Sequence, residues 1–436
     1  MTIGQTPPTR AANADTTAAL IDLFPEGAYV DGDGQLVVAG LRVNDIAERF
    51  GTPAYVFDEN SLLRQAIRMR EALTSRWPRS KVMFASKAFP SVAAYRTLAN
   101  AGLGVDVAGG GELAAALAAD VPPERILLHG NAKTSEEIRL AVEAGVGTVV
   151  IDNFDDIDKL EQIVPDTQDV LIRVLPNIAA DTHEAMATGQ RGSKFGMVKA
   201  DADVAVSRLR NSERLNLRGL HMHIGSQICD TAPYSEAVKA LAEFGEFDVY
   251  DVGGGLGARY TYSDNPPSVE EWLDALTGAA RQYLPADAEL MIEPGRSLVA
   301  RSGYTIYRVV SVKHGEPTFV AVDGGMGDNL DVALYGQRFE ATLAHRVGGG
   351  APVELVGRHC ESGDRLSAGV ALSEPRVGDV IAVPVTGAYC ITMANNYNGA
   401  RRPPIVFCRD GDAQLVVRRE TYDDLLRREQ TLVRER

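Results

Sequence analysis

The sequence predicts a (β/α)₈ barrel of the TIM type followed by a second domain made mostly of β-strands. Three observations support this fold class, α/β plus all-β. Short β-type runs recur from residue 81 onward in the 436-residue chain, and the first five start about 22 residues apart. Helical patterns fill the gaps, and each gap has the length that a parallel crossover connection needs. After about residue 300 the helical patterns become scarce, which indicates a change of fold.

Eight consecutive β-type runs are expected, which is the number of strands in a (β/α)₈ barrel. Helical patterns such as Glu112–Ala119 and Ser135–Ala144 lie between them. A doubly wound open sheet is the main alternative, but it rarely uses eight consecutive units. The runs are Lys81–Phe84, Gly104–Val107, Ile126–Leu128, Thr148–Ile151, Val170–Val174, Leu217–His223, Phe247–Val252 and Glu289–Ile292.

The C-terminal part predicts a β-sandwich or a Greek-key barrel, because its β-type runs are separated by Gly, Pro and Asp turns. We expect three parts: residues 1–47, an N-terminal segment that contributes to the β domain; residues 48–300, the barrel; and residues 301–436, the β domain, with a helical pattern at Tyr422–Arg434. The six β-type runs are Tyr304–Val312, Thr318–Val322, Val353–Val356, Val380–Val383, Ile405–Cys408 and Gln414–Arg418.

Composition narrows the function classes. The formal net charge of −15 disfavours a nucleic-acid-binding protein, which usually presents a basic face. The four cysteines are far apart and form no CxxC pair, so a disulfide framework or a structural zinc site is not expected. No run has the length of a membrane span or of a signal-peptide core. We therefore expect a cytoplasmic protein that binds neither nucleic acid nor membrane.

Polar groups follow almost every predicted barrel strand, at the rim where such barrels carry their chemistry. Lys87 ends an apolar strand, and a lysine amine in an apolar setting can attack an aldehyde. Any one such residue is more often a loop cap or a solvated side chain, but the whole set is unusual. The groups are Lys87, Asp106, His129-Gly130-Asn131, Asp152-Asn153, Arg173, His223, Gly253-Gly254-Gly255 and Glu293.

These groups fit pyridoxal phosphate (PLP). The triplet Gly253-Gly254-Gly255 allows backbone N–H groups to approach a phosphate, although glycine loops also occur for turn reasons alone. Glu293 is a carboxylate suited to a pyridine nitrogen, and His223 is a flat ring suited to stacking. His221 fits a core histidine, so we leave it outside the site. No HExxH pattern is present, and no metal is expected.

Many segments in order resemble the fold-type III PLP-dependent decarboxylases, and among them the diaminopimelate decarboxylases, from about Val43 to Leu426. The segments are Phe84-Ala85-Ser86-Lys87-Ala88-Phe89, Asp106-Val107-Ala108-Gly109-Gly110-Gly111-Glu112-Leu113, His129-Gly130-Asn131-Ala132-Lys133, Thr182-His183-Glu184, Ser193-Lys194-Phe195-Gly196, His223-Ile224-Gly225-Ser226-Gln227, Gly253-Gly254-Gly255, Glu293-Pro294-Gly295-Arg296, Cys360-Glu361-Ser362-Gly363-Asp364 and Gly387-Ala388-Tyr389.

The resemblance implies an alanine racemase-like architecture and a homodimer with shared active sites. It implies that Lys87 binds the cofactor covalently, with His223 stacked on the ring and Glu293 at its nitrogen. Ser226, Gly253 to Gly255, Gly295 and Arg296 would hold the phosphate, and Tyr389 would contact cofactor and substrate. Cys360, near the reacting carbon, and Glu361, at the distal amine, would come from the partner subunit. Catalytic roles thus fall to Lys87, His223 and Cys360, and substrate contacts to Arg296, Asp331, Tyr335, Glu361 and Tyr389.

The implied activity is decarboxylation of meso-2,6-diaminopimelate to L-lysine and CO₂. One residue departs from the family pattern: Asp331 stands where these enzymes usually carry an arginine for the distal carboxylate. An anion there would repel that carboxylate. A relative acting on another amino acid or on an intermediate of specialised metabolism is therefore the alternative. A racemase of the same barrel class fits less well, because the Cys360–Asp364 run is typical of decarboxylases. A non-catalytic regulator would be expected to lack Lys87 or the glycine triplet.

Overall fold

The computed structural model describes residues 14–176, 178 and 192–430, and these form two compact units. Of the described residues, the first unit contains 14–61, 260–263 and 301–430, and the second contains 62–176, 178, 192–259 and 264–300. The motif Thr182-His183-Glu184 lies outside the described residues. The domain limits expected from the sequence stay a prediction. None of the described helices is long and apolar enough to cross a membrane.

The second unit is a closed barrel of eight strands, in the order β10-β11-β12-β5-β6-β7-β8-β9, and every neighbouring pair is parallel. This confirms the predicted barrel over the open sheet. The strands are β5 (Ser80–Ala85), β6 (Gly104–Val107), β7 (Ile126–Leu128), β8 (Thr148–Ile151), β9 (Gln168–Arg173), β10 (Leu215–His221), β11 (Val249–Asp251) and β12 (Glu289–Ile292).

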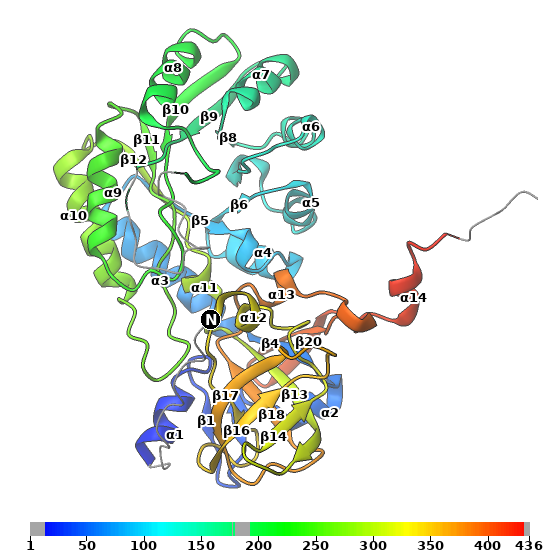
Figure 1. Cartoon of the computed structure of the whole chain (residues 1–436). Helices are drawn as coiled ribbons and strands as arrows, with labels where there is room; N and C mark the ends of the chain where they lie inside the picture. Colours follow the sequence, from blue (N-terminus) through cyan, green and yellow to red (C-terminus); the bar gives the residue numbers. More distant parts are fainter. Residues whose placement is uncertain (1–13, 177, 179–191, 431–436) are drawn as a thin grey trace, which may run out of the picture. The chain divides into compact units, whose positions relative to one another are not determined.

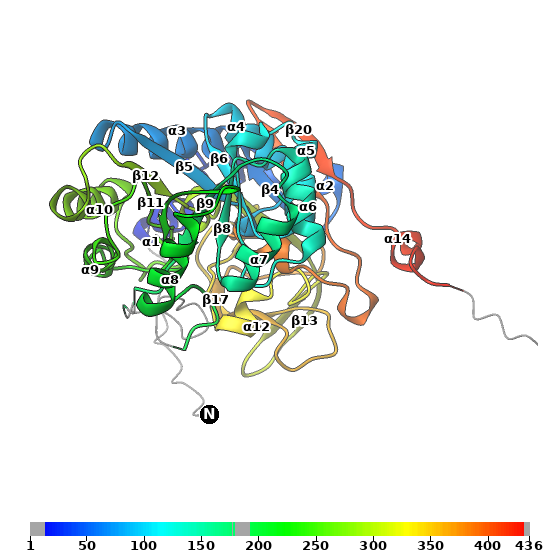
Figure 2. The same cartoon turned by 90° about the horizontal axis from the view of Figure 1, so that it is seen from above.

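Helices surround this barrel, and Figures 1 and 2 show α4 to α7 outside strands β5 to β9. Several begin at side-chain caps: Thr134 and Glu137 form a reciprocal capping box on α6, and Ser268 and Glu271 form another on α10. The helices are α3 (Glu59–Arg76), α4 (Val92–Asn100), α5 (Gly110–Ala118), α6 (Ser135–Ala144), α7 (Phe154–Ile163), α8 (Lys199–Leu209), α9 (Ala232–Ala242), α10 (Val269–Tyr283) and α11 (Arg296–Val299).

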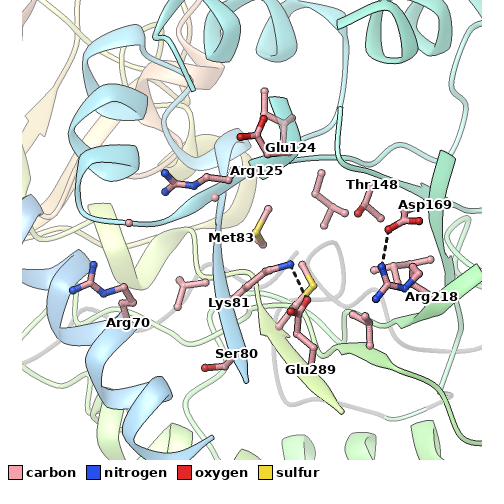
Figure 3. A pocket seen from close by; sticks show the side chains of 18 of the residues that line it. Arg70, Ser80, Lys81, Met83, Glu124, Arg125, Thr148, Asp169, Arg218 and Glu289 are labelled. Atoms are coloured by element: carbon pink, nitrogen blue, oxygen red, sulfur yellow. Dashed lines mark hydrogen bonds and ion pairs between the residues drawn. The ribbon is translucent and has the colours of Figure 1, made fainter. Parts of the chain in front are cut away.

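The barrel interior has an apolar layer, and a pocket of about 370 Å³ opens at the amino-terminal ends of the strands. Figure 3 shows Lys81 reaching toward Glu289 and Arg218 toward Asp169, at 2.9 Å and 2.7 Å respectively. None of the predicted site residues lines this pocket. The carboxyl ends of the strands, where the predicted site lies, are the opposite rim. The buried layer is Met83, Leu127, Val150, Leu171, Val249 and Met291.

The first unit contains a mixed nine-stranded sheet with the main order β17-β16-β14-β13-β4-β19-β20, to which β15 and β18 are joined. Strand β4 lies at its centre, antiparallel to β13 and parallel to β19. A second, three-stranded sheet has the order β1-β2-β3. The strands are β1 (Tyr29–Val30), β2 (Leu36–Val38), β3 (Leu41–Arg42), β4 (Ala54–Asp58), β13 (Gly303–Lys313), β14 (Phe319–Val322), β15 (Thr342–Leu343), β16 (Ala351–Val356), β17 (Arg365–Leu372), β18 (Val380–Pro384), β19 (Ile405–Arg409) and β20 (Asp412–Val417).

Side chains from both ends of the chain share one core in this unit, including Phe24, Val56, Tyr304 and Val406. The predicted C-terminal helix is shorter than expected, because it ends at Leu426 and residues 427–430 are not helical. The helices of this unit are α1 (Ala14–Ile21), α2 (Val43–Phe50), α12 (Asp331–Tyr335), α13 (Cys390–Met393) and α14 (Tyr422–Leu426).

A buried ion pair links two of the barrel's strand-to-helix loops. The Lys133 Nζ donates to Asp156 Oδ2 at 2.6 Å and to the Gly130 carbonyl at 2.5 Å. The same Asp156 oxygen accepts from the Asp152 N–H at 3.0 Å. Both charged side chains are almost completely buried. Burial lowers the pKa of Lys133, and Asp156 opposes that shift. The attraction between the two charges therefore offsets the cost of removing each from water.

We expect Lys133→Met to lower the free energy of unfolding by about 3–5 kcal/mol, because it leaves the Asp156 carboxylate buried without its cation. Chemical denaturation followed by circular dichroism measures this loss. The double variant Lys133→Met/Asp156→Asn is the control, since it removes both charges and retains an acceptor for the Asp152 N–H. It should recover much of the lost stability. A single variant as stable as the parent chain would contradict this account.

Candidate active site

Lys87 lies in a single turn of 3-10 helix, Ser86–Ala88, directly after strand β5. Neighbouring side chains fix this turn. The Ser86 hydroxyl donates to Glu112 Oε2 at 2.8 Å, and the same oxygen accepts from the Ala108 N–H at 2.7 Å. Glu112 thus joins the turn after β5 to the loop after β6. The lysine is held at the carboxyl end of the barrel by hydrogen bonds that do not involve its own amine.

The glycine triplet after β11 forms a cradle with no room for side chains. Gly253 and Gly255 have φ values of +68° and +111°, which side-chain-bearing residues rarely adopt. A Cβ on Gly254 would lie 2.0 Å from the Glu293 carbonyl oxygen, and one on Gly253 would lie 2.9 Å from the His223 Nδ1. The Gly253 carbonyl accepts from the Glu293 N–H at 2.8 Å. The cradle therefore packs against both His223 and Glu293.

A cationic side chain, Arg296, and a polar one, Ser226, lie beside this cradle. The Arg296 Nε and Nη2 each lie 3.4 Å from the Ser226 hydroxyl oxygen. The Gly254 N–H donates to His223 Nδ1 at 3.2 Å. Strand β10 ends at His221, so His223 lies two residues beyond the strand that we expected it to close. Burial lowers the pKa of His223 well below its usual range, and Lys87 and Arg173 lower it further.

Glu293 is buried between two imidazoles. His129 Nε2 lies 2.5 Å from Glu293 Oε1, and His221 Nε2 lies 3.1 Å from Oε2. The two rings meet edge to face, with centroids 4.6 Å apart. Burial alone would raise the pKa of Glu293, but the two histidines outweigh it and lower the pKa well below its usual range. The arrangement favours an ionised carboxylate inside the barrel.

The pKa values of two other acids at the rim are shifted in the opposite direction, upward. Burial raises the pKa of Asp106 to about 7 and that of Asp251 well above its usual range, and Glu293 contributes to both shifts. Burial also lowers the pKa of Arg173. Closely spaced buried carboxyl groups cannot all ionise at low cost. Glu293 is therefore the acid of this cluster that is best supported as an anion.

These groups fit PLP. The cofactor needs an amine for its aldehyde, an anion for its pyridine nitrogen and donors for its phosphate. Lys87, Glu293 and the Ser226–Arg296 pair beside the glycine cradle are groups of these kinds. The cradle is closed to side chains but consists of backbone, as an anion site requires. The structure therefore brings together the site residues predicted within the barrel: Lys87, His223, Ser226, Gly253, Gly254, Gly255, Glu293, Gly295 and Arg296.

The remaining predicted site residues, Cys360, Glu361, Asp331, Tyr335 and Tyr389, belong to the first unit. Hydrogen bonds join the loop that carries Cys360 and Glu361 to two neighbouring loops. His359 Nε2 accepts from the Gly327 N–H at 3.2 Å, and Asp364 Oδ1 accepts from the Met326 N–H at 2.6 Å. The Cys360 N–H donates to Asn398 Oδ1 at 2.9 Å. Three loops, 324–330, 357–364 and 394–399, thus form one connected group.

The five predicted site residues of the first unit differ in the exposure of their side chains. Cys360 and Glu361 are exposed, Tyr335 and Tyr389 are half-buried, and Asp331 is only 1% exposed. Tyr389 has a φ of +66° and begins helix α13, so its backbone is held in an uncommon conformation. The side chain of Asp331, at the start of α12, is the least accessible of the five.

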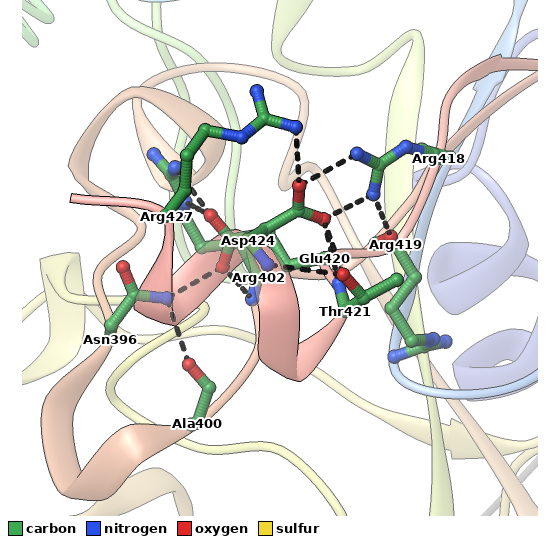
Figure 4. A network of polar contacts seen from close by, with 9 residues as sticks. All are labelled: Asn396, Ala400, Arg402, Arg418, Arg419, Glu420, Thr421, Asp424 and Arg427. Carbon is green, nitrogen blue, oxygen red and sulfur yellow. Dashed lines mark hydrogen bonds and ion pairs between the residues drawn. The ribbon is translucent and has the colours of Figure 1, made fainter. Parts of the chain in front are cut away.

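A polar network at the C-terminal end anchors loop 394–399, whose Asn398 binds the Cys360 N–H (Figure 4). Glu420 accepts from Asn396 Nδ2 at 2.6 Å and from the Arg402 backbone N–H at 2.8 Å. Thr421 and Asp424 form a capping box on α14, and Arg418 pairs with Asp424. The segment after β20 thereby anchors the residues next to Asn398.

Three residues that matter to this geometry were not assigned roles from the sequence. His129 was noticed only as a strand-end group, Glu112 only as part of a motif, and His221 was left outside the site. Their positions at or near strand ends were the available signal. Their partners became evident only in the closed barrel.

Comparisons with known proteins agree with this site. Residues 59–300 match the model of the family described as "Pyridoxal-dependent decarboxylase, pyridoxal binding domain". The chain is 45% identical to a diaminopimelate decarboxylase of Actinosynnema pretiosum subsp. auranticum, over 93% of this chain and 95% of the relative. It is 42% identical to that of Bacillus subtilis, over 90% and 95% of the two chains.

Solved structures give the same picture. A diaminopimelate decarboxylase of M. jannaschii, solved also with L-lysine, superposes with a TM-score of 0.88 at 31% identity, over 94% of this chain and 98% of that one. Fold, cofactor groups and sequence similarity thus lead to one conclusion: the chain belongs to the pyridoxal-dependent decarboxylase family, among the diaminopimelate decarboxylases.

Proposed function

We propose that this enzyme, a PLP-dependent carboxy-lyase, removes CO₂ from meso-2,6-diaminopimelate to give L-lysine. The observation that carries the proposal is the cluster of Lys87, the glycine cradle and Glu293 at one barrel rim, in a chain 45% identical to a diaminopimelate decarboxylase. The M. jannaschii relative was crystallised with L-lysine, the product expected here. The four cysteines are free thiols, which supports action in the reducing cytoplasm.

The residues of the rim have distinct tasks in this proposal. Bound PLP supplies an electron sink for the pair released when the carboxylate leaves. Lys87 would hold the cofactor through its aldehyde. Glu293 presents an anion to the pyridine nitrogen, and His223 offers an uncharged ring face because its pKa is low. Ser226 and Arg296 bind the phosphate beside the glycine cradle, whose Gly253 and Gly254 N–H groups already donate to Asp251 and His223. Glu293 and Arg296 are buried, which strengthens their electrostatic interactions.

The first-unit loops supply the substrate contacts in this proposal, and Cys360 and Glu361 act in the active site of the partner subunit of a homodimer. Both are exposed in the single chain. Glu361 binds the distal amine, Cys360 returns a proton to the α-carbon, and Tyr389 contacts substrate and cofactor.

Asp331 favours a second candidate substrate. A buried carboxylate replaces the usual arginine, so the distal carboxylate of diaminopimelate loses its cation. A diamino acid without a distal carboxylate, or with an amide there, would not meet this repulsion. Arg296 and Tyr335 remain as binding groups for either substrate.

Replacing Lys87 tests the central assignment. Lys87→Ala should abolish both the near-visible absorbance of lysine-bound PLP and CO₂ release, because it removes the amine that holds the aldehyde. Absorption spectra and CO₂ assays against diaminopimelate, lysine, ornithine, arginine and glutamate derivatives measure both effects. Lys81→Ala, at the other end of the same strand, should leave both unchanged. Turnover by Lys87→Ala would refute the assignment.

Mixing two inactive variants tests the shared site. Lys87→Ala and Glu361→Ala should each lack activity, and unfolding and refolding them together should restore roughly a quarter of the parent activity. Random pairing makes about half of the dimers mixed, and each mixed dimer has one intact site. The separately refolded variants serve as controls. Failure to recover activity, with mixed dimers present, would argue against contributions from the partner.

Asp331→Arg tests the choice of substrate. If Asp331 repels the distal carboxylate, Asp331→Arg should raise kcat/KM for diaminopimelate about ten-fold or more relative to lysine, since a charge-assisted hydrogen bond contributes roughly 1.5–3 kcal/mol. Asp331→Asn removes the anion without adding a cation and should give a smaller gain. An unchanged ratio in both variants would show that Asp331 does not select the substrate.

A further inference from the structure

We infer that His129 and His221 are a pair of positioning residues that hold the Glu293 carboxylate ionised and aimed at the pyridine nitrogen of PLP. The inference rests on the proposed cofactor site and adds two residues to it. His129 Nε2 and His221 Nε2 each reach a different oxygen of Glu293, at 2.5 Å and 3.1 Å. Each carboxylate oxygen keeps a second lone pair for another donor. The imidazoles therefore fix the carboxylate and leave each of its oxygens able to accept a further hydrogen bond.

The protonation of His221 follows from its surroundings. Its Nδ1 is buried and has no hydrogen-bond partner among the described residues. A cationic imidazole would leave an unpaired N–H at that position, which is costly in a buried site. The neutral ring with its proton on Nε2 avoids this cost and donates to Glu293. Burial, which lowers the pKa of His221 to about 3, supports the same state. His221 is thus a neutral donor.

The donors are needed because the surroundings of Glu293 are hostile to an anion. Asp251 ends β11, which is next to β12, and Asp106 lies on β6; burial raises the pKa of both, and their interaction with Glu293 raises it further. Arg173 is near enough for Glu293 to act on its pKa, but no hydrogen bond or ion pair joins the two among the described residues. Without one imidazole, an oxygen of Glu293 would be buried with fewer donors, and the protonated acid would be favoured.

The geometry also explains why two rings are used. His129 follows β7, His221 ends β10 and Glu293 follows β12, so the three groups come from separated parts of the barrel wall. The rings contact each other edge to face at 4.6 Å. Each ring therefore limits the rotation of the other, and together they limit the rotation of the carboxylate. A protonated, wrongly turned Glu293 would weaken the electron sink, while the covalent bond to Lys87 would remain.

A matched pair of variants tests this inference on the holoenzyme. His221→Gln retains an N–H donor near the original Nε2, whereas His221→Met has nearly the same length and no donor. We expect His221→Met to bind PLP about ten-fold more weakly in equilibrium dialysis and to lower kcat about ten-fold, with little change in KM. His221→Gln should restore most of both. His129→Met and His129→Gln should differ from each other in the same way as the two His221 variants. They provide a second pair if one His221 variant folds poorly.

A cofactor analogue separates positioning from simple packing. In 1-deaza-PLP a C–H group replaces the ring nitrogen, so Glu293 has no pyridine N–H to meet. His221→Met and the parent chain should bind this analogue equally well. Equal weakening toward PLP and the analogue would mean a merely structural role and would overturn the inference. Lost PLP affinity of the parent chain after treatment with a metal chelator would overturn it too, since the three groups would then hold a metal.

The outcome also distinguishes this inference from the proposed function. A parent chain that forms no lysine-bound PLP would defeat the proposed function itself. A parent chain that binds PLP and releases CO₂, with a His221→Met variant indistinguishable from it toward both cofactors, would defeat only the role of the histidines.

Discussion

The pairing of the last barrel strand with the first is the constraint on which the site depends. Strand β12 pairs with β5 through Leu290 and Ser80, Met291 and Lys81, and Ile292 and Val82. Beyond this seam, the Ala85 N–H donates to the Pro294 carbonyl at 3.2 Å, and Gly295 packs against Ala85 and Ala88. The turn that carries Lys87 is therefore fixed against the turn that follows Glu293. An open sheet with the same strands would separate the amine from the carboxylate.

This closure gathers more ionisable groups at one rim than a folded protein would keep for stability alone. Asp106, Arg173, Asp251 and Glu293 are all at most 9% exposed. Burying such charges is costly unless they are paired or neutralised. The raised pKa values of Asp106 and Asp251 and the lowered pKa of His221 are the response, because three groups move toward their neutral forms while Glu293 keeps its charge. Keeping the buried Glu293 carboxylate ionised is therefore expected to lower the stability of the folded protein.

Local pattern was sufficient to predict the barrel, since each strand is an apolar run with helical pattern on both sides. It was not sufficient for contacts between distant segments. Nothing in the composition of β4 places Ala54–Asp58 between β13 and β19, and β17 was missed because Arg365–Leu372 contains a glycine and small residues that weaken the β signal. His221 looked like a core histidine for the same reason: its partner is 72 residues away and meets it only when the barrel closes.

The two groups of predicted site residues differ in how freely they can change. On the barrel rim, Glu293 is buried and bonded to two histidines, and the glycine cradle packs closely against its neighbours, so replacing either disturbs several residues at once. Those on the loops of the first unit include the exposed Cys360 and Glu361, and exposed loops tolerate substitution more easily than a packed core. Reaction type and substrate choice are then subject to different constraints. Asp331 is an exception among the first-unit residues, because its side chain is only 1% exposed and it lies at the start of helix α12 rather than on an exposed loop.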